Sequence, residues 1–249
     1  MQKNHQKIAS NIASLAHKIL SHEAKKHGPA DPAYYKSKLT FIGSIPVGLQ
    51  RSIAQSEHFM LEKEHAWHVW SHVFLSSDVF HIKSLALFFA ERFKGKLTLE
   101  HWKILKTWVR GVENWAHSDS LCSLLSELFE KYPAQLLPTY KKWNKSKNPW
   151  ERRISIVGLY YYARCRKIRQ PSFELAHSFL KPLFSDSDFY VQKAVGWTLR
   201  EMYQAHPQKT LKLIFSRAAT LHPLAIQAST EKFNVKTKAQ FMKLRRDKE

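Results

Sequence analysis

Apolar residues recur at steps of three and four along almost the whole chain, which is the spacing of amphipathic helices. The pattern is clearest in residues 5–26, 82–93, 118–131 and 188–204. No alternating stretch is long enough to predict a strand. The chain also has only 7 Gly, which is few for the tight turns of an all-β protein. The sequence therefore predicts an all-α fold.

Four predicted helices begin in the same way, with a capping residue before an apolar run. These starts are Ser77-Asp78, Ser118-Asp119, Asn148-Pro149 and Ser187-Asp188. They follow one another at intervals of about 30 to 41 residues, as expected for paired-helix units of the HEAT type. Stacked units of this kind form a solenoid with a concave side. We therefore expect a HEAT-like helical-repeat solenoid.

The chain shows no linker that would divide this stack, so residues 1–249 are expected to form a single domain. Residues 232–249 are basic and polar, and we expect a final helix or a tail there. Prolines fall near the predicted helix ends, where they are best tolerated. They are Pro133, Pro138, Pro171, Pro182, Pro207 and Pro223.

The chain carries 40 Lys and Arg against 20 Asp and Glu, a formal net charge of +20. This excess indicates a polyanionic partner, either a nucleic acid or an anionic membrane surface. Eight Trp favour the nucleic acid, because indole rings stack on bases and pack on sugars. A generally basic protein without such a ligand is the remaining interpretation. Combined with the repeats, the charge predicts a concave basic groove.

Several other kinds of site and location are not expected. Cys122 and Cys165 are far apart in sequence and make neither a disulfide framework nor a zinc site. His65, His68 and His72 have helical spacing, but no adjacent Cys or carboxylate completes a metal site. No Walker loop, nucleophile elbow or dinucleotide fingerprint is present. No apolar run approaches the ~20 residues of a membrane span, and no secretory segment begins the chain, so we expect a cytoplasmic protein.

Trp197 stands out in the helix predicted over residues 188–204. It lies about 140° from the centre of the apolar face, and Lys193 and Arg200 flank it. A large apolar side chain is uncommon on the charged side of a helix. Trp197 is therefore either covered by another repeat or part of an aromatic surface in a basic groove.

Trp115 and Asp119 lie four residues apart and share a face if the helix extends back to Trp115. Asp119 projects about 140° away from the leucine face of residues 118–131, beside Ser123 and Ser126. A carboxylate repels phosphate and is costly in a groove for nucleic acid. Asp119 is therefore either an N-cap or a group that takes part in chemistry.

Arg152 and Arg153 are adjacent at a predicted helix start, where positive charge opposes the helix dipole. Guanidinium groups match the geometry of phosphate, so the pair could hold a phosphate. The alternative is a surface ion pair with Glu151 or another neighbour.

Two segments, NPWERRISI at 148–156 and VQKAVGWTLRE at 191–201, resemble the AlkD-type DNA alkylation repair glycosylases. WAHSD at 115–119 and the segment 34–43 also resemble that family, and the resemblance runs from about residue 30 to 235. It implies a HEAT-like solenoid that binds duplex DNA in its concave face as a monomer. The family removes cationic alkylpurines, such as 3-methyladenine and 7-methylguanine, without flipping the base into a pocket and without metal or cofactor.

Carried over residue by residue, the resemblance implies that Asp119 is the catalytic carboxylate. Trp115 and Trp197 would pack against the deoxyribose of the lesion. Arg153 would contact a backbone phosphate, and Tyr34 is a further candidate for a DNA contact.

Three other basic residues are candidates for DNA binding. Arg152 takes the role of Arg153 if the match to the family shifts by one residue. Lys193 and Arg200 flank Trp197. One departure from the family concerns Ala116, which stands where members often have an acidic residue. It bears on the capping of the local helix and on the shape of the site.

The expected chemistry agrees with these residue types. N-alkylation makes a purine cationic and a good leaving group, so cleavage needs little acid catalysis. A carboxylate at Asp119 would stabilise positive charge developing on the sugar and orient the attacking water. Two alternatives belong to other classes: a non-catalytic HEAT-repeat binder of bent or branched DNA, and a helical scaffold for an acidic protein.

Overall fold

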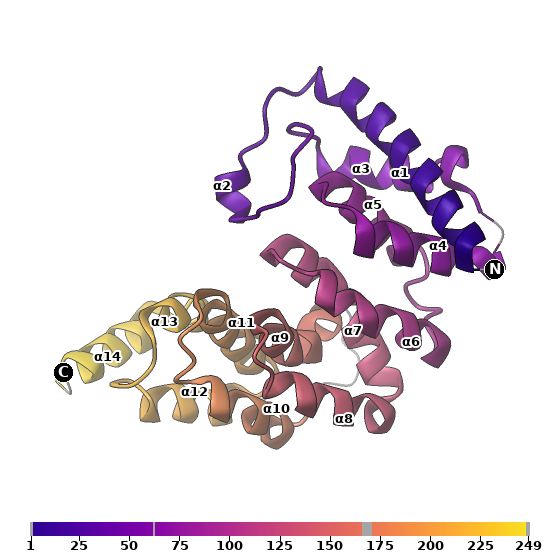
Figure 1. The fold of residues 1–249 in the computed structure, drawn as a ribbon. Helices are drawn as coiled ribbons and strands as arrows, with labels where there is room; N and C mark the ends of the chain where they lie inside the picture. The colour runs from indigo at the N-terminus through magenta and orange to yellow at the C-terminus, as the bar shows by residue number, and fades with distance from the viewer. Residues whose placement is uncertain (1, 62, 166–170, 248–249) are drawn as a thin grey trace. The chain divides into compact units, whose positions relative to one another are not determined.

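The computed structural model describes residues 2–61, 63–165 and 171–247, and within these ranges the protein is helical (Figure 1). The only extended pairing there is a single bridge between Thr40 and Val79. The all-α prediction is confirmed. In chain order the helices are α1 (Gln2–Ala24), α2 (Pro32–Tyr35), α3 (Val47–Gln55), α4 (Lys63–Ser76), α5 (Phe80–Glu91), α6 (Leu99–Trp108), α7 (Trp115–Lys131), α8 (Pro133–Asn144), α9 (Pro149–Cys165), α10 (Phe173–Leu180), α11 (Phe189–Ala205), α12 (Pro207–Ser216), α13 (Pro223–Ser229) and α14 (Val235–Arg246), with short 3-10 turns at Glu57–Phe59, Val109–Gly111 and Lys181–Leu183.

The chain divides into two compact units, Met1–Leu128 and Phe129–Glu249. The division falls inside α7 and not in a loop, which agrees with the absence of a linker in the sequence. None of the described helices combines the length and apolar character needed to cross a bilayer.

The second unit shows the paired-helix layering expected of HEAT-like repeats. α11 packs between α9 and α13, and these three helices form one layer. α8 packs against α9, α12 packs against α11, and α10 contacts both α9 and α11, so the shorter partners form a second layer (Figure 1). The close approach of α11 and α13 depends on Gly196, whose Cα faces the backbone of Ala225.

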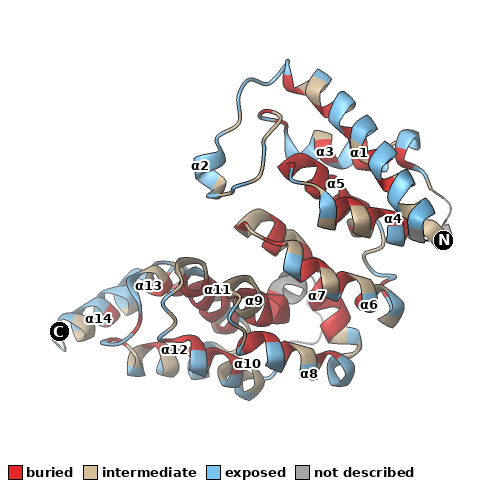
Figure 2. Ribbon diagram, in the orientation of Figure 1, coloured by how far each residue is buried: buried red, intermediate tan, exposed pale blue. Residues whose placement is uncertain are grey.

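The first unit is built around α5. α3 and α4 both pack on α5, α1 packs mainly on α4, and α6 covers another side of α4. The sequence predicts one buried face for this helix, but every residue from Phe80 to Ala90 is buried (Figure 2). The prediction is wrong in this detail because neighbours cover α5 on more than one side.

Two of the four predicted helix starts are confirmed by cap geometry. Asp188 accepts hydrogen bonds from the N–H groups of Tyr190 and Val191, and Asn148 accepts one from Trp150. α5 instead begins at Phe80, after Val79, which provides no side-chain cap. The fourth start, Ser118-Asp119, is wrong, because α7 begins three residues earlier at Trp115.

The prolines and the C-terminal stretch agree largely with the sequence. Pro133, Pro207 and Pro223 each open a helix. Pro138 is an exception, because it lies inside α8, where its missing N–H removes one backbone hydrogen bond. The basic C-terminal stretch forms a helix, α14, and buried Phe241 anchors it to the second unit.

We predict that Gly196→Ala destabilises the second unit by about 1–3 kcal/mol, the usual cost of overpacking. A Cβ at this position would lie 2.5 Å from the carbonyl oxygen and 2.8 Å from the Cα of Ala225, which are backbone atoms that move only with α13. Urea unfolding measures the loss. The matched control is Gly48→Ala in α3, where nothing lies within 4 Å of the new Cβ. The free energy of unfolding of this control should rise by up to about 1 kcal/mol, because alanine favours a helix over glycine. Equal effects of the two changes on the free energy of unfolding would contradict the packing argument.

Candidate functional site

The first turn of α7 is fixed by the side chain of Asn114. Its Oδ1 accepts a hydrogen bond from the backbone N–H of His117 at 2.9 Å, and this is the N-cap of the helix. The Asn114 Nδ2 donates to Nδ1 of His117 at 2.9 Å and to the carboxylate of Glu113 at 2.9 Å. Ala116 therefore leaves the capping intact, because Asn114 supplies it.

This cap excludes one of the two interpretations of Asp119, that of an N-cap. Asp119 lies in the second turn of α7, one turn after Trp115, and cannot be the N-cap. Both side chains are partly exposed. Ser123 and Ser126, which the sequence places on the same outward side, are instead buried, so the accessible strip around Asp119 is narrow.

Trp115 belongs to a cluster of aromatic rings in the first unit. Its ring centroid lies 5.6 Å from that of Tyr35 in a stacked arrangement and 5.5 Å from that of Tyr34 in an edge contact. Tyr35 also contacts Phe41 and Phe80, at 5.4 and 4.7 Å. Tyr34 is 65% exposed, so its ring and the indole of Trp115 present an aromatic surface to solvent.

The sequence prediction missed Tyr35, which stacks on Trp115, and Phe41, which stacks on Tyr35. The loop that carries them is tied to the rest of the unit at two points. Thr40 exchanges backbone hydrogen bonds of 2.9 Å with Asp78 and Phe80 at the start of α5. Glu113 accepts hydrogen bonds from the backbone N–H of Lys38 and the hydroxyl of Ser37. The sequence signals that point to this segment are its density of aromatic residues and the resemblance of residues 34–43 to the repair family.

Arg152 is held within the second unit. Its guanidinium makes two hydrogen bonds to Asp186, at 2.6 and 3.0 Å, and its NH1 donates to the carbonyls of Ser146 and Lys147, at 2.8 and 3.1 Å. This bidentate pair ties the start of α9 to the loop before α11. The structure therefore supports the ion-pair interpretation of Arg152.

Arg153 is buried, at 5% exposure, and its NH1 donates to the carbonyl of Tyr190 at 2.9 Å. The ring of Tyr190 in turn packs on Trp150, with centroids 4.9 Å apart. Arg153 thus joins the first turns of α9 and α11. A phosphate contact would require the guanidinium to exchange or share this hydrogen bond.

Three candidate residues lie on α11. Trp197 is partly exposed, so α13 does not cover it fully. The Arg200 guanidinium lies 5.7 Å from the Trp197 ring and is paired with Glu201 at 3.0 Å and with Glu231 at 2.6 Å. Lys193 is exposed, with its ammonium 5.1 Å from the ring of Phe189. Of these two cations, Lys193 is the more available to a phosphate.

The candidate residues therefore form two groups. Tyr34, Trp115 and Asp119 belong to the first unit, where the structure brings Tyr34 and Trp115 into contact. The candidates on α9 and α11 belong to the second unit, where Trp197 and Arg200 are in contact.

Three buried titratable groups surround the start of α7. Burial, with the nearby Lys83 charge, lowers the pKa of His117 to about 3, and burial lowers that of His81 to about 4. His117 is held by Asn114, by the Ser84 hydroxyl at 3.0 Å and by the Phe80 carbonyl at 3.2 Å. Burial also lowers the pKa of Lys83 to about 8, with Glu113 and Asp78 opposing the shift. Both histidines are neutral at pH 7.

Comparison with known proteins identifies one matching family and several solved structures of similar fold. A family model described as DNA alkylation repair enzyme matches residues 15–233. A solved structure described as a predicted DNA alkylation repair enzyme from Enterococcus faecalis is similar with a TM-score of 0.66 and 20% identity, covering 82% of this chain and 93% of that chain. Two structures from Streptococcus mutans, smu.31 and AlkD2, each give a TM-score of 0.49 and 21% identity, covering 80% and 81% of this chain and 90% and 89% of theirs. Comparison with curated protein sequences gives no significant match.

We predict that the protein loses stability as the pH falls below 6.5. Burial lowers the pKa values of His117 and His81 to about 3 and about 4, below the 6.5 of a histidine exposed to water. The unfolded chain therefore binds more protons in this window, and stability present above pH 6.5 is lost on acidification. Each histidine contributes about 1.4 kcal/mol per pH unit, or about 4 kcal/mol for both between pH 7 and 5.

Urea unfolding at several pH values measures this dependence. His117→Gln should reduce the pH dependence by about half, since one of the two groups is removed, whatever its effect on stability at pH 7. His22→Gln is the control, because His22 is exposed on α1. An unchanged pH dependence in His117→Gln would show that His117 is not buried in its neutral form.

Proposed function

Because the chain belongs to the family of DNA alkylation repair enzymes, we propose that it is a monofunctional DNA glycosylase for cationic alkylated purines. It would hydrolyse the N-glycosidic bond of bases such as 3-methyladenine and 7-methylguanine in duplex DNA, as the first step of base excision repair. The partner is duplex DNA with alkylated bases, bound by a monomer in a concave basic groove. The scheme requires no metal or cofactor.

The observation that carries this proposal is the position of Asp119 on α7. It is a partly exposed carboxylate one turn from Trp115, and the N-cap of α7 is Asn114 and not Asp119. In a chain with 20 excess positive charges, a carboxylate beside an aromatic surface is unfavourable for phosphate binding alone. It is favourable where positive charge develops on a deoxyribose during bond cleavage.

The proposed mechanism uses the charge already present on the lesion. The alkylated purine leaves with the electron pair of the glycosidic bond and becomes neutral, while the sugar becomes an oxocarbenium-like cation. Asp119 stabilises this cation and orients the water that attacks it. His117, two residues before Asp119, is buried and neutral and supplies no proton. Neutral lesions, which need a proton on the leaving base, should therefore react slowly or not at all.

The aromatic and basic candidates would position the DNA. The indoles of Trp115 and Trp197 would pack against the deoxyribose and favour its positive charge by about 0.5–2 kcal/mol each. The exposed ring of Tyr34 extends the surface of Trp115. Because this scheme acts on the sugar and not on the base, the lesion can stay in the base stack, without base flipping.

The proposal assigns the backbone phosphates to cations of α9 and α11. Arg153 would contact a phosphate near the lesion, and Lys193 is exposed and ready for one. We assign Arg200 and Arg152 a lesser share of DNA binding, because both already hold carboxylates.

We predict that Asp119→Asn lowers excision by on the order of 100-fold or more, because the amide cannot stabilise the cationic sugar. DNA affinity should stay equal or rise slightly, since a negative charge is removed. The measurement is release of methylated purine from alkylated duplex DNA, with binding followed on the same duplex. Asp78→Asn, an exposed carboxylate of the same unit, should keep the wild-type rate. Full activity in Asp119→Asn would reject the assignment.

A second candidate function is a non-catalytic binder of bent or branched DNA, which would use the exposed aromatic surface of Tyr34 and Trp115 and the exposed Lys193 without chemistry at Asp119. The excision assay separates the two. Wild-type protein that binds alkylated duplex DNA but releases no base above the spontaneous rate would establish the binder and reject the glycosylase.

We predict that Lys193→Ala weakens DNA binding and reduces the slope of log affinity against log salt by about 0.9, the share of one phosphate contact in B-DNA. The control is Lys209→Ala, which removes the same charge from α12 in the other helix layer, where Lys209 is paired with Glu174 at 2.7 Å. Binding titrations at several salt concentrations give both slopes. The same slope in both variants would place the DNA elsewhere than on α11.

A further inference from the structure

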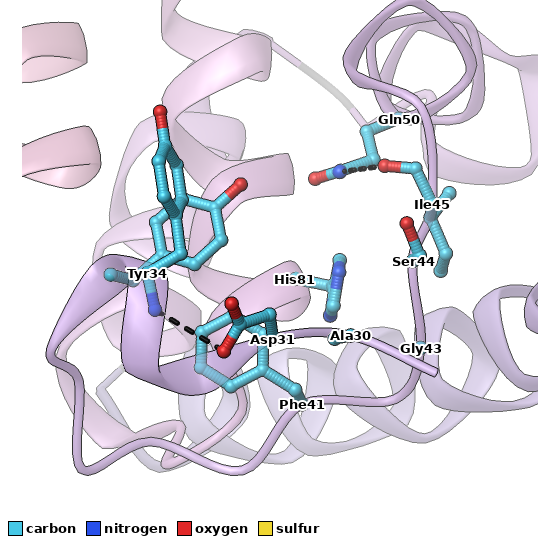
Figure 3. Close-up of a pocket in the computed structure, with 10 residues that line it drawn as sticks. Ala30, Asp31, Tyr34, Phe41, Gly43, Ser44, Ile45, Gln50 and His81 are labelled. Carbon is cyan, nitrogen blue, oxygen red and sulfur yellow. Dashed lines mark hydrogen bonds between the residues drawn. The ribbon is translucent and has the colours of Figure 1, made fainter. Parts of the chain in front are cut away.

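A pocket of about 260 Å³ opens beside the aromatic cluster, wholly within the first unit (Figure 3). Its volume is slightly below the ~300–1,000 Å³ typical of sites for drug-sized ligands, so it suits one small ring system. Figure 3 shows Tyr34, Asp31 and Phe41 on one side, Gln50, Ser44 and Ile45 on the other, and the ring of His81 between them.

One wall of the pocket is aromatic and is shared with the candidate site. Tyr34, Tyr35 and Phe41 all line it, and Tyr34 and Tyr35 are the two residues whose rings contact Trp115. Aromatic walls of this kind favour a flat ligand that can stack or make edge contacts. The two tyrosines thus connect the pocket to the surroundings of Trp115.

Two buried side chains give the pocket a fixed donor and a fixed acceptor. His81 is 3% exposed, and its Nδ1 accepts a hydrogen bond from the backbone N–H of Ile42 at 3.4 Å, so its proton is on Nε2. Gln50 is 4% exposed, and its Nε2 donates to the carbonyl of Ile45 at 2.7 Å, so its Oε1 is left as an acceptor. Because the pKa of His81 is lowered to about 4 by burial, the ring stays neutral at pH 7.

The charge of the lining excludes a phosphate. Asp31 is the one charged residue among the lining residues, and no Lys or Arg takes part, although the chain carries 40 of them. Oδ1 of Asp31 accepts the backbone N–H groups of Ala33 and Tyr34, at 3.0 and 3.3 Å. Its carboxylate adds a second acceptor for N–H groups. A neutral ring with ring nitrogens and exocyclic amino groups satisfies all of these features.

We propose that this pocket binds a purine ring that has left the base stack. The ring would lie against the tyrosine wall, accept a hydrogen bond from Nε2 of His81 at a ring nitrogen, and donate to Gln50 or Asp31 from its N–H groups. The inference rests on the proposed function for the origin of the ring. The source is the free base released by the reaction, because the proposed mechanism leaves the lesion in the stack until the glycosidic bond breaks. A base extruded from the duplex presents the same chemistry, so the experiment has to separate this second source from the first.

Binding of a free base tests the first source. Calorimetric titration with 3-methyladenine and with adenine should give saturable binding to the full chain, and inorganic phosphate should give none. Ala30→Leu and Ser44→Leu fill the pocket from partly or fully exposed positions and should weaken binding on the order of tenfold or more. Ser10→Leu, at an exposed serine of α1, is the control and should bind as the wild type does.

A duplex that carries 2-aminopurine tests the second source, because the fluorescence of this base rises when it leaves the stack. No rise is expected if the pocket takes the released base. A rise on binding wild-type protein that is lost in Ser44→Leu would show that the pocket takes a base from intact DNA and would contradict the mechanism without base flipping. No signal with either the free base or the duplex, or binding that the leucine variants do not change, overturns the proposal. Urea unfolding of the variants establishes that they are folded.

Base release, measured on the same preparations, reports on the proposed function separately. Excision by wild-type protein without purine binding in either experiment rejects the pocket and leaves the glycosylase. Purine binding without excision supports the pocket and rejects the glycosylase.

Discussion

The hydrogen bond from the backbone N–H of His117 to the side chain of Asn114 determines where α7 begins. A helix that begins at Trp115 places Asp119 in its second turn. Its carboxylate therefore does not serve as a cap for the backbone N–H groups of the first turn. Burial of the His117 ring against Phe80 and Ser84 then fixes this turn to α5. The placement of both Trp115 and Asp119 follows from this cap.

The three candidate arginines of the second unit are engaged within the protein. Arg152 and Arg200 each hold a carboxylate in close geometry, and Arg153 donates to a backbone carbonyl. Such groups fix the geometry of α9 and α11, and a phosphate must compete with partners already in place. Exposed lysines such as Lys193 are therefore more available to a phosphate than these three arginines.

The sequence gives good guidance wherever a feature is local. Caps at Asn148 and Asp188, prolines at helix starts and the period of the apolar residues are set by neighbours within one or two turns. The guidance from the sequence is poorer where segments distant in the chain cover a helix. The complete burial of α5 depends on α3 and α4, and the contact of Tyr35 with Trp115 joins residues 80 positions apart, so neither leaves a mark in a periodic pattern.

The sequence by itself determined that the chain is helical and that its helices pair in repeats, and it gave Trp115 and Asp119 the spacing of one helix face. These properties follow from steps of three and four residues along one helix. Only the tertiary structure decided that Asp119 is not a cap, that Arg152 serves an internal ion pair and that three aromatic rings and two buried polar groups enclose a pocket. Each of these depends on which segments pack together, and packing is decided by side chains far apart in the chain.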